Sequence, residues 1–115
     1  MVSLRTPEGE KAYSDYRATR TEEDGCALCD AVVLKTFSHW KVIPNKFPYD
    51  RIAGKHNMII PIRHVVEEEL TTEERTEFFE IKDEVTKGYN WIIEATPSTK
   101  SIPEHFHLHL VAGKM

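Results

Sequence analysis

The sequence predicts an α+β fold, in which an antiparallel sheet of about five strands carries one main helix packed on one face. Short runs rich in β-branched and aromatic residues predict the strands. Apolar residues recur at helical spacing between Thr71 and Gly88, and this stretch predicts the main helix. Several of the connections between strands are too short for a parallel crossover, so these neighbours should pair antiparallel. We expect a single domain over residues 1–115.

The elements before the main helix are short. A polar helix is expected at 7–20, inside an N-terminal helical extension that covers residues 1–24. Two strands are expected at 32–37 and 39–43, the second ended by a proline. Residues 45–55 contain proline, aspartate and glycine, so a loop is expected there.

The second half of the chain gives clearer signals. A short strand is expected at 58–60, and Thr71 and Glu74 have the spacing of a capping box at the start of the main helix. The apolar positions of this helix are Phe78, Ile81 and Val85, and Gly88 is expected to end it. A strand at 89–95 and a polar loop at 96–104 should then lead to the last strand.

Three histidines alternate with apolar residues in this last strand, which reads His105-Phe106-His107-Leu108-His109-Leu110-Val111. Successive side chains of a strand point to opposite faces, so the three imidazoles should share one face. The apolar residues between them should pack into the core. We therefore expect the imidazoles to line a surface groove.

The histidine pattern suits two kinds of chemistry. Imidazoles two residues apart lie roughly 6.5–7 Å apart along a strand and can converge on one metal ion. A neutral imidazole can instead attack phosphorus and form a covalent nucleotidyl-histidine. An amphipathic strand without chemistry is the simplest alternative, although strict alternation of three histidines disfavours it.

Composition excludes several classes of protein. The formal net charge of −4 argues against a binder of nucleic acid polymers, although a local basic pocket for one nucleotide is compatible with it. No apolar run is long enough to span a bilayer, and the N-terminus lacks the apolar core of a signal peptide. We expect a cytoplasmic protein that does not bind membranes.

The only cysteines, Cys26 and Cys29, are three residues apart. In a reducing compartment this spacing favours a metal site or a redox pair over a structural disulfide. The redox reading lacks the expected βαβ context, and two buried thiols are the simpler alternative. A metal site would need two further ligands.

Three blocks of the chain together resemble the histidine triad (HIT) superfamily. Residues 105–111 resemble its signature His-φ-His-φ-His-φ-φ, where φ is apolar. Residues 40–65 resemble its strand-loop-strand, and Cys26-x-x-Cys29 resembles its N-terminal zinc half-site. The resemblance runs from about Gly25 to the C-terminus, and it looks closest to the zinc-containing and dinucleoside-polyphosphate phosphorylase-like branches.

The resemblance implies a nucleotide-binding hydrolase or nucleotidyl transferase that acts at the α-phosphate of a nucleotide, with AMP-containing substrates expected. His107 would be the nucleophile, His109 would donate to the α-phosphate, and His56 would support the triad. Asn45 would contact the ribose or phosphate, and Phe47 would form a wall of the base pocket. A homodimer is also implied.

The resemblance further implies a structural zinc ion. His64 and His105 would complete the ligand set of Cys26 and Cys29, which separates the metal from the nucleophile His107.

The segment before the triad departs from the family pattern. Many members carry Gly-x-Ser or Gly-x-Thr there, whereas this chain has residues 98–104 with Ser101 or Thr99 as the substitute hydroxyl; Ser101 is expected to bind the nucleotide. Two alternatives stay open. One is a nucleotide- or zinc-binding module without significant turnover, and the other is a catalytic zinc enzyme that uses all three triad histidines as ligands.

Overall fold

The computed structural model describes residues 3–98 and 102–114. Its described elements are α1 (Pro7–Thr19), η1 (Glu22–Asp24), β1 (Lys35–Thr36), β2 (Trp40–Pro44), β3 (Ala53–Pro61), η2 (Glu67–Glu69), α2 (Thr72–Val85), β4 (Trp91–Ile93) and β5 (Leu108–Gly113). The five strands of the described part form one sheet in the order β1-β2-β3-β5-β4, and every neighbouring pair is antiparallel. This confirms the predicted α+β fold.

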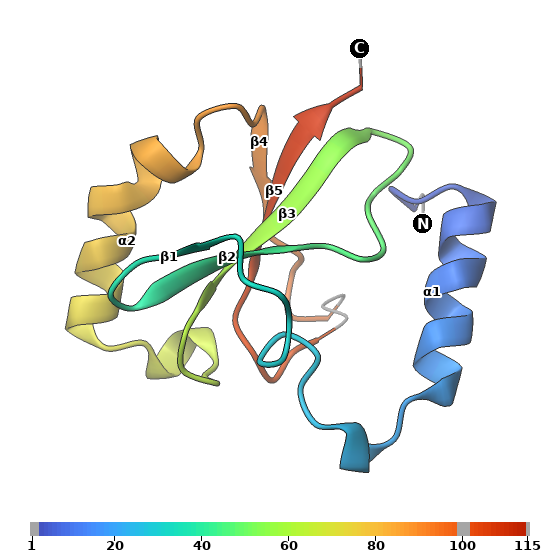
Figure 1. Ribbon diagram of the computed structural model, residues 1–115, viewed down its shortest axis with the longest axis horizontal. Helices are drawn as coiled ribbons and strands as arrows, with labels where there is room; N and C mark the ends of the chain where they lie inside the picture. Colours follow the sequence, from blue (N-terminus) through green and yellow to red (C-terminus); the bar gives the residue numbers. More distant parts are fainter. Residues whose placement is uncertain (1–2, 99–101, 115) are drawn as a thin grey trace.

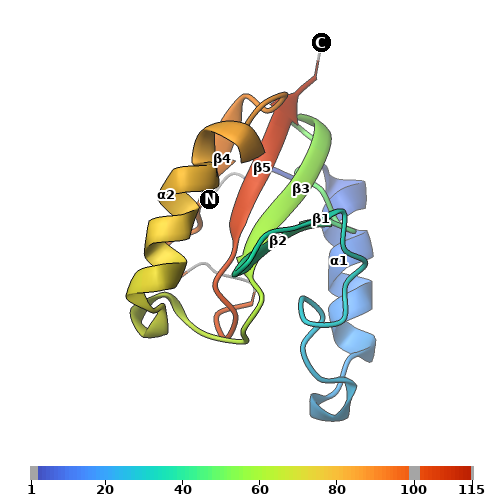
Figure 2. The ribbon, with the colours of Figure 1, turned by 60° about the vertical axis from the view of Figure 1, so that its left-hand side comes forward.

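The two α-helices lie on opposite sides of the sheet, as Figures 1 and 2 show. The side of α2 holds the main apolar cluster, formed by Trp40, Val42, Ile59, Val85, Phe106, Leu108 and Leu110. The other side holds a smaller cluster, formed by Leu28, Ile43, Met58 and Ile60. Alternation along β2 and β3 separates the two clusters, because neighbouring residues of a strand face opposite sides.

Helix α2 begins as predicted, with a complete capping box. The Thr71 hydroxyl accepts from the Glu74 amide at 3.1 Å, and the Glu74 carboxylate accepts from the Thr71 amide at 2.8 Å. The Glu74 side chain also pairs with Arg63 and is only 2% exposed. The indole of Trp40 donates to the Glu74 carbonyl at 2.8 Å, so the start of α2 is fixed to the sheet.

The predicted N-terminal helix is present as α1, but it buries none of its residues. Polar contacts hold its start. Both the amide and the hydroxyl of Thr6, the N-cap residue, donate to the Asp50 carboxylate, at 2.6 and 2.8 Å. The Thr6 hydroxyl in turn accepts from the Gly9 amide at 3.1 Å.

Several predicted strand boundaries are wrong. Of 32–37, only Lys35 and Thr36 pair as a strand, and of 89–95 only Trp91–Ile93 do. The loop predicted at 45–55 ends early, because β3 begins at Ala53, where its backbone pairs with the end of β5. Pairing with the distant strand β5 makes residues 53–55 part of a strand, although the glycine among them favours a loop.

The ladder of β5 begins at Leu108, so the first two triad histidines precede it. Continuing the register of β3 and β5 would place Phe106 opposite Pro61, which has no amide hydrogen to donate. Pro61 therefore cannot donate to the Phe106 carbonyl, and the Phe106 amide donates outside the sheet, to the Val65 carbonyl at 2.8 Å. The extended chain before β5 is therefore held by contacts outside the sheet.

No helix in the described ranges is long and apolar enough to cross a membrane.

Candidate active site and metal centre

The three histidines of the triad are buried, and the expectation of an open surface groove is wrong. The exposed fractions of His105, His107 and His109 are 0%, 3% and 3%. The N-terminal segment lies over this side of the sheet, with α1 opposite α2 (Figure 2). The site is thus enclosed between β5 and a segment from the start of the chain.

His105 has a defined orientation. Its Nε2 lies 3.0 Å from the Pro61 carbonyl oxygen, which can only accept, so Nε2 carries the hydrogen of the neutral ring. The lone pair is therefore on Nδ1, which lies 3.5 Å from the Cys26 sulfur and 3.4 Å from the Cys29 sulfur. Burial lowers the pKa of His105 and keeps its ring neutral, as a metal ligand must be.

The fourth predicted ligand joins the same cluster. His64 Nδ1 lies 3.2 Å from the Cys29 sulfur, and the ligand atoms of Cys26, Cys29, His64 and His105 all lie within 4.8 Å of one another. Zinc bonds of about 2.0–2.3 Å in a tetrahedron would place such atoms roughly 3.3–3.8 Å apart. The distances to both sulfurs are close to this range, so the residues fit a tetrahedral zinc ion.

Burial affects the protonation of the Cys29 thiol. Burial, with a further contribution from Cys26, raises the pKa of Cys29 to about 11. A divalent ion at this position would reverse that effect and favour the thiolate. Both cysteines are free thiols and partly exposed, so the reading as two buried thiols is wrong.

The triad does not gather around one metal position. His105 Nδ1 faces the two sulfurs, whereas the Nδ1 atoms of His107 and His109 face the His105 carbonyl and His56. Within the described residues, the one group placed to bind a metal is the Cys₂His₂ cluster. The three-histidine zinc site is therefore not supported.

His107 is held in the tautomer that a nucleophile needs. Its Nδ1 lies 2.9 Å from the His105 carbonyl oxygen, so Nδ1 carries the hydrogen. The lone pair is on Nε2, and the ring lines a pocket beside His109. The same short segment thus turns His105 toward the sulfurs and His107 toward the pocket.

His56 and His109 form a directed chain of hydrogen bonds. His56 Nδ1 accepts from the Tyr49 amide at 3.0 Å, so its Nε2–H donates to His109 Nδ1 at 2.9 Å. His109 must then carry its hydrogen on Nε2, which lies 3.1 Å from the Tyr49 hydroxyl. His109 therefore presents a hydrogen-bond donor on the side of the pocket.

Both of these histidines are neutral at physiological pH. Burial, with a smaller contribution from the Arg5 charge, lowers the pKa of His56 to about 4. Burial, together with the charges of His107, His56 and Arg5, lowers the pKa of His109 to about 3. A neutral His109 can still donate through Nε2.

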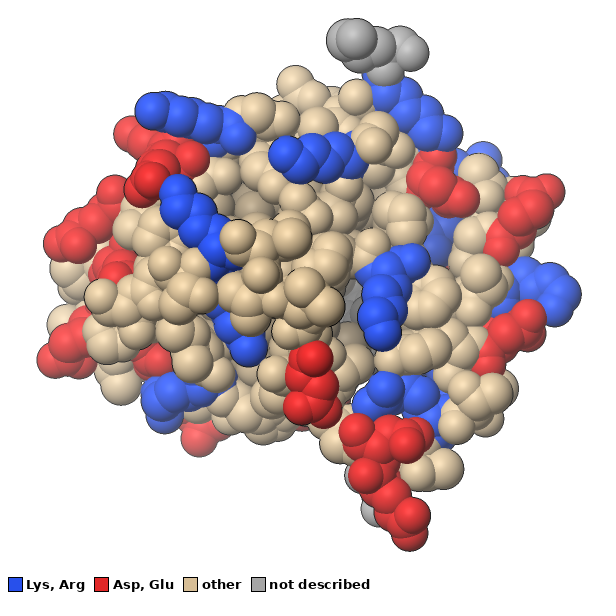
Figure 3. All heavy atoms as spheres, viewed as in Figure 1, with Lys and Arg blue, Asp and Glu red and all other residues tan. Residues whose placement is uncertain are grey.

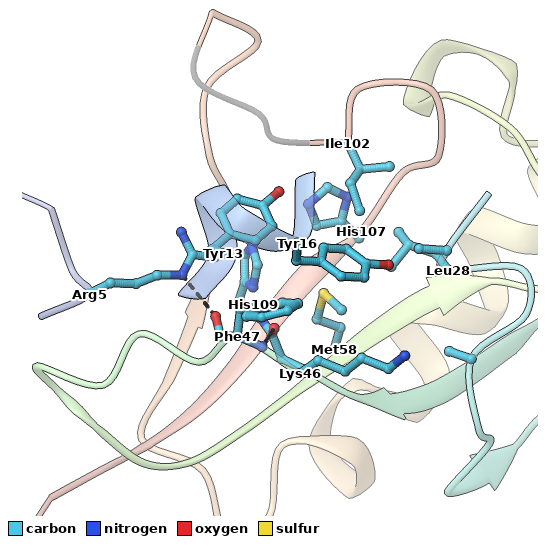
Figure 4. A pocket seen from close by; sticks show the side chains of 13 residues that line it. Arg5, Tyr13, Tyr16, Leu28, Lys46, Phe47, Met58, Ile102, His107 and His109 are labelled. Atoms are coloured by element: carbon cyan, nitrogen blue, oxygen red, sulfur yellow. Dashed lines mark hydrogen bonds between the residues drawn. The ribbon is translucent and has the colours of Figure 1, made fainter. Parts of the chain in front are cut away.

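The pocket also contains the two residues predicted to contact the ribose, phosphate or base. Asn45 and Phe47 line it together with Tyr13 and Tyr16 of α1, as Figure 4 shows for the labelled side chains. The Phe47 ring centroid lies 5.3 Å from that of Tyr13 and 4.8 Å from that of Tyr16. The Asn45 amide nitrogen lies 3.1 Å from His56 Nε2. Ser101, the predicted hydroxyl donor, lies outside the described residues.

The pocket is small in this conformation. Its volume is about 70 Å³, below the 300–1,000 Å³ that is typical of small-molecule sites. The aromatic rings of α1 and Phe47 fill much of the space beside the histidines. A nucleotide would have to displace part of this aromatic packing.

The chain matches known proteins in its structure and not in its sequence. No family model and no curated protein matches the sequence. A HIT family hydrolase from Clostridium thermocellum superposes with a TM-score of 0.58 at 19% identity, covering 79% of this chain and 92% of that one. A HIT family hydrolase from Legionella pneumophila Philadelphia 1 gives 0.56 at 18% identity, covering 79% and 95%. A histidine triad protein from Clostridium difficile gives 0.58 at 16% identity, covering 84% and 94%.

The chain has the histidine triad fold. The sequence resemblance carried by the triad and the Cys-x-x-Cys pair thus agrees with the fold of solved proteins. These superpositions cover 79–84% of this chain.

Sequence reasoning missed two residues that this histidine triad fold brings to the site. Tyr49 lies against both His56 and His109, with ring centroids 4.7 and 4.8 Å away. Arg5, from the segment before α1, lines the pocket with His107 and His109. Tyr49 lies within the stretch that resembles the family, which is the only signal that could have drawn attention to it. Nothing in the sequence around Arg5 marks it.

Proposed function

We propose that the chain is a nucleotidyl hydrolase or transferase that works through a nucleotide covalently attached to His107. The observation that carries the proposal is the hydrogen bond from His107 Nδ1 to the His105 carbonyl, which leaves the lone pair on Nε2 in a pocket with a neutral donor. A fixed tautomer and a nearby donor for phosphoryl oxygens are what covalent catalysis by histidine requires.

In the first step, His107 Nε2 attacks the α-phosphorus and a P–N bond forms. The bond from phosphorus to the leaving group breaks, and its electron pair goes with that group. In the second step, water or another acceptor attacks phosphorus, the P–N bond breaks, and its electrons return to Nε2. The proton lost by water passes to the solvent.

His109 would support both steps by donating its Nε2–H to an oxygen of the α-phosphate. That hydrogen points to the Tyr49 hydroxyl at 3.1 Å, so a bound phosphate would replace the phenol oxygen as acceptor. His56 would act as a positioning residue, because its bond to His109 Nδ1 fixes the His109 tautomer. Asn45 would contact the ribose or phosphate, and Phe47 would contact the base.

The test compares turnover of nucleotides that carry a group on the α-phosphate. Suitable substrates are a dinucleoside polyphosphate, a nucleotide sugar and an adenosine phosphoramidate. His107→Ala and His107→Asn should lower kcat/KM by at least about a thousandfold, because the covalent route is lost. His39→Ala is the matched control, since the His39 contact to Glu77 uses its backbone amide. Equal turnover by the wild type and both His107 variants would contradict the proposal.

A nucleotide-binding module without significant turnover is the second candidate. The observation that favours it is that residues 98–104 lack the Gly-x-Ser or Gly-x-Thr pattern of the family. Tight binding of AMP, with no turnover of any of the three substrates, would establish it in place of the enzyme.

We also propose a structural zinc ion held by Cys26, Cys29, His64 and His105 in a reducing compartment, the cytoplasm. When bound, the ion would join the N-terminal segment to the chain that carries the triad, without contacting His107. Cys26→Ser should weaken zinc binding at least about a hundredfold, since even loss of an outer-shell contact costs up to that much. Purified protein whose zinc content is unchanged by Cys26→Ser would contradict this assignment.

We further propose that residues 1–115 act as one domain and assemble as a homodimer. Strand β4 is at an edge of the sheet, and its Trp91 is 49% exposed. Light scattering after size-exclusion chromatography should give twice the chain mass, and a monomer at micromolar concentration would contradict the proposal.

A further inference from the structure

Arg5 is a nearly buried cation that points into the pocket of the triad. Its side chain is 12% exposed, and it lines the pocket with His107 and His109. In Figure 4 it reaches in from the segment before α1 and bonds to the Phe47 backbone. Charged side chains this well covered usually have a close partner of opposite charge.

Neutral groups hold the Arg5 guanidinium in place. Its Nε donates to the Phe47 carbonyl at 2.9 Å, and its central carbon lies 4.3 Å from the Tyr13 ring centroid and 5.1 Å from that of Tyr49. The Arg5 carbonyl accepts from Arg51 Nε at 2.8 Å, which fixes the backbone as well. These contacts orient the guanidinium without neutralising its charge.

The one carboxylate paired with Arg5 among the described residues is a poor partner. Glu10 lies 3.5 Å from Arg5 Nη1, its side chain is 45% exposed, and the same oxygen also accepts from the Ser3 hydroxyl. Charge-assisted bonds between guanidinium and an anion are normally shorter, about 2.7–2.9 Å, and often bidentate. Within the described part of the chain, the pocket therefore contains a positioned cation whose charge is only weakly matched by a carboxylate.

The charge of Arg5 lowers the pKa values of two histidines of the site. After burial, it is one of the causes that lower the pKa values of both His56 and His109. The face in Figure 3 shows acidic side chains over α1 and α2, with several Lys and Arg side chains between them. Arg5 and Lys46 both line the pocket, so a protein with a net charge of −4 places cations where an anionic substrate would bind.

We propose that Arg5 binds a phosphate of the substrate beyond the α-phosphate, so that the preferred substrates are phosphoanhydrides. This inference rests on the proposed function, because it places the α-phosphate between His107 and His109. When the P–O bond to the bridging oxygen breaks, its electron pair stays on the leaving phosphate, and Arg5 would stabilise that charge. The amine that leaves a phosphoramidate takes a proton from the solvent as the P–N bond breaks, so it carries no such charge and gains nothing from Arg5.

The first test measures binding without turnover. Calorimetry should show that the wild type binds ADP roughly 10- to 100-fold more tightly than AMP, as expected for one charge-assisted contact to the extra phosphate. Arg5→Met should reduce this ratio to about one, and Arg5→Lys should retain part of it because the charge remains. Arg17→Met is the matched control, since Arg17 lies 5.6 Å from the same Tyr13 ring but does not line the pocket.

An unchanged ADP-to-AMP ratio in Arg5→Met, or no preference for ADP in the wild type, would overturn the proposal. Thermal melts of the variants check that they fold. If Arg5→Met does not fold, the ratio in Arg5→Lys decides: a ratio equal to that of the wild type would also overturn it.

The second test uses turnover and separates this proposal from the proposed function. Arg5→Met should lower kcat/KM for a dinucleoside tetraphosphate roughly 10- to 100-fold, and for an adenosine phosphoramidate less than about threefold. Equal losses on both substrates would overturn the role of Arg5 while leaving the His107 chemistry intact. An Arg5-dependent ADP preference in a protein with no turnover would retain the Arg5 site and contradict the enzyme.

Discussion

The two sides of the sheet are built on different principles. The side of α2 is a conventional core, in which aliphatic and aromatic side chains from β2, β3 and β5 meet an amphipathic helix. The side of α1 encloses four buried histidines under a helix that buries none of its own residues. The first side provides stability through apolar area, whereas the second is held by hydrogen bonds, aromatic contacts and a cluster of thiols and imidazoles.

Strand β5 contributes to both the apolar core and the histidine pocket. Along β5, Leu108 and Leu110 face the core, while His109 faces the pocket. Apolar burial on one face fixes the strand, so the imidazoles on the other face keep their positions next to a smaller apolar cluster. Substitutions on the two sides should therefore have separable effects on stability and activity.

The largest effect on stability is expected on the α2 side. Leu110 is fully buried, so Leu110→Ala should lower the free energy of unfolding by about 2–5 kcal/mol through lost burial and a cavity. Urea denaturation measures the change. Val32→Ala, at a residue that is 73% exposed, is the control and should cost less than about 0.5 kcal/mol. A loss below about 1 kcal/mol for Leu110→Ala would show that this side is not the main source of stability.

The two sides should lose stability in different pH ranges. His56 and His109 have pKa values lowered to about 4 and about 3, so the unfolded chain takes up their protons first as the pH falls. Their contribution is complete above the ordinary value of 6.5 and is lost as the pH falls from 6.5 toward 4 for His56 and toward 3 for His109. We expect a loss of at least about 2 kcal/mol over this range. In urea titrations, His56→Gln should make stability depend less steeply on pH between these limits, and an unchanged slope would contradict the assignment.

The contribution of Glu74 to stability should be lost at lower pH than that of the histidines. The Arg63 hydrogen bond and the bonds from Thr71 lower the pKa of Glu74 to about 2. Because the folded pKa is lower than the ordinary 4.5, its contribution is present above pH 4.5 and is lost as the pH falls toward 2. Glu74→Gln should remove this second phase while leaving the phase between pH 6.5 and 4 in place.

The smallest effects should come from the two helix caps. Thr71→Ala should lower the free energy of global unfolding by about 1 kcal/mol, because it breaks the capping box of a helix that is packed on the core. Thr6→Ala removes both the cap of α1 and a bond to Asp50, yet α1 contributes no buried residue. Its effect should appear as faster hydrogen exchange of the α1 amides, with little change in global unfolding. Equal effects of the two substitutions on global unfolding would show that the two sides are not independent.

The sequence predicted those features that depend on local patterns. Thr71 and Glu74 mark the start of α2 because a capping box is local, and the alternation around His107 places the triad on one face because strand geometry is local. The grouping of Cys26, Cys29, His64 and His105 was implied by the family resemblance alone.

Features that depend on distant pairing could not be predicted in the same way. The start of β3 at Ala53 depends on pairing with Gly113, and β5 starts late because the chain before it bonds to Val65 outside the sheet. The segments that carry Arg5 and Tyr49 are joined by long-range contacts, among them the bonds from Thr6 to Asp50. No local pattern encodes such a contact between residues 44 positions apart.

The measurement that tests the central claim most directly is alkaline quenching during turnover of a substrate labelled in the α-phosphate. The label should appear on the wild-type chain as an acid-labile, alkali-stable phosphoramidate on His107, and it should be absent from His107→Asn. Turnover without any labelled protein, or a label that persists on the His107→Asn chain, would contradict a nucleotidyl-histidine at this position.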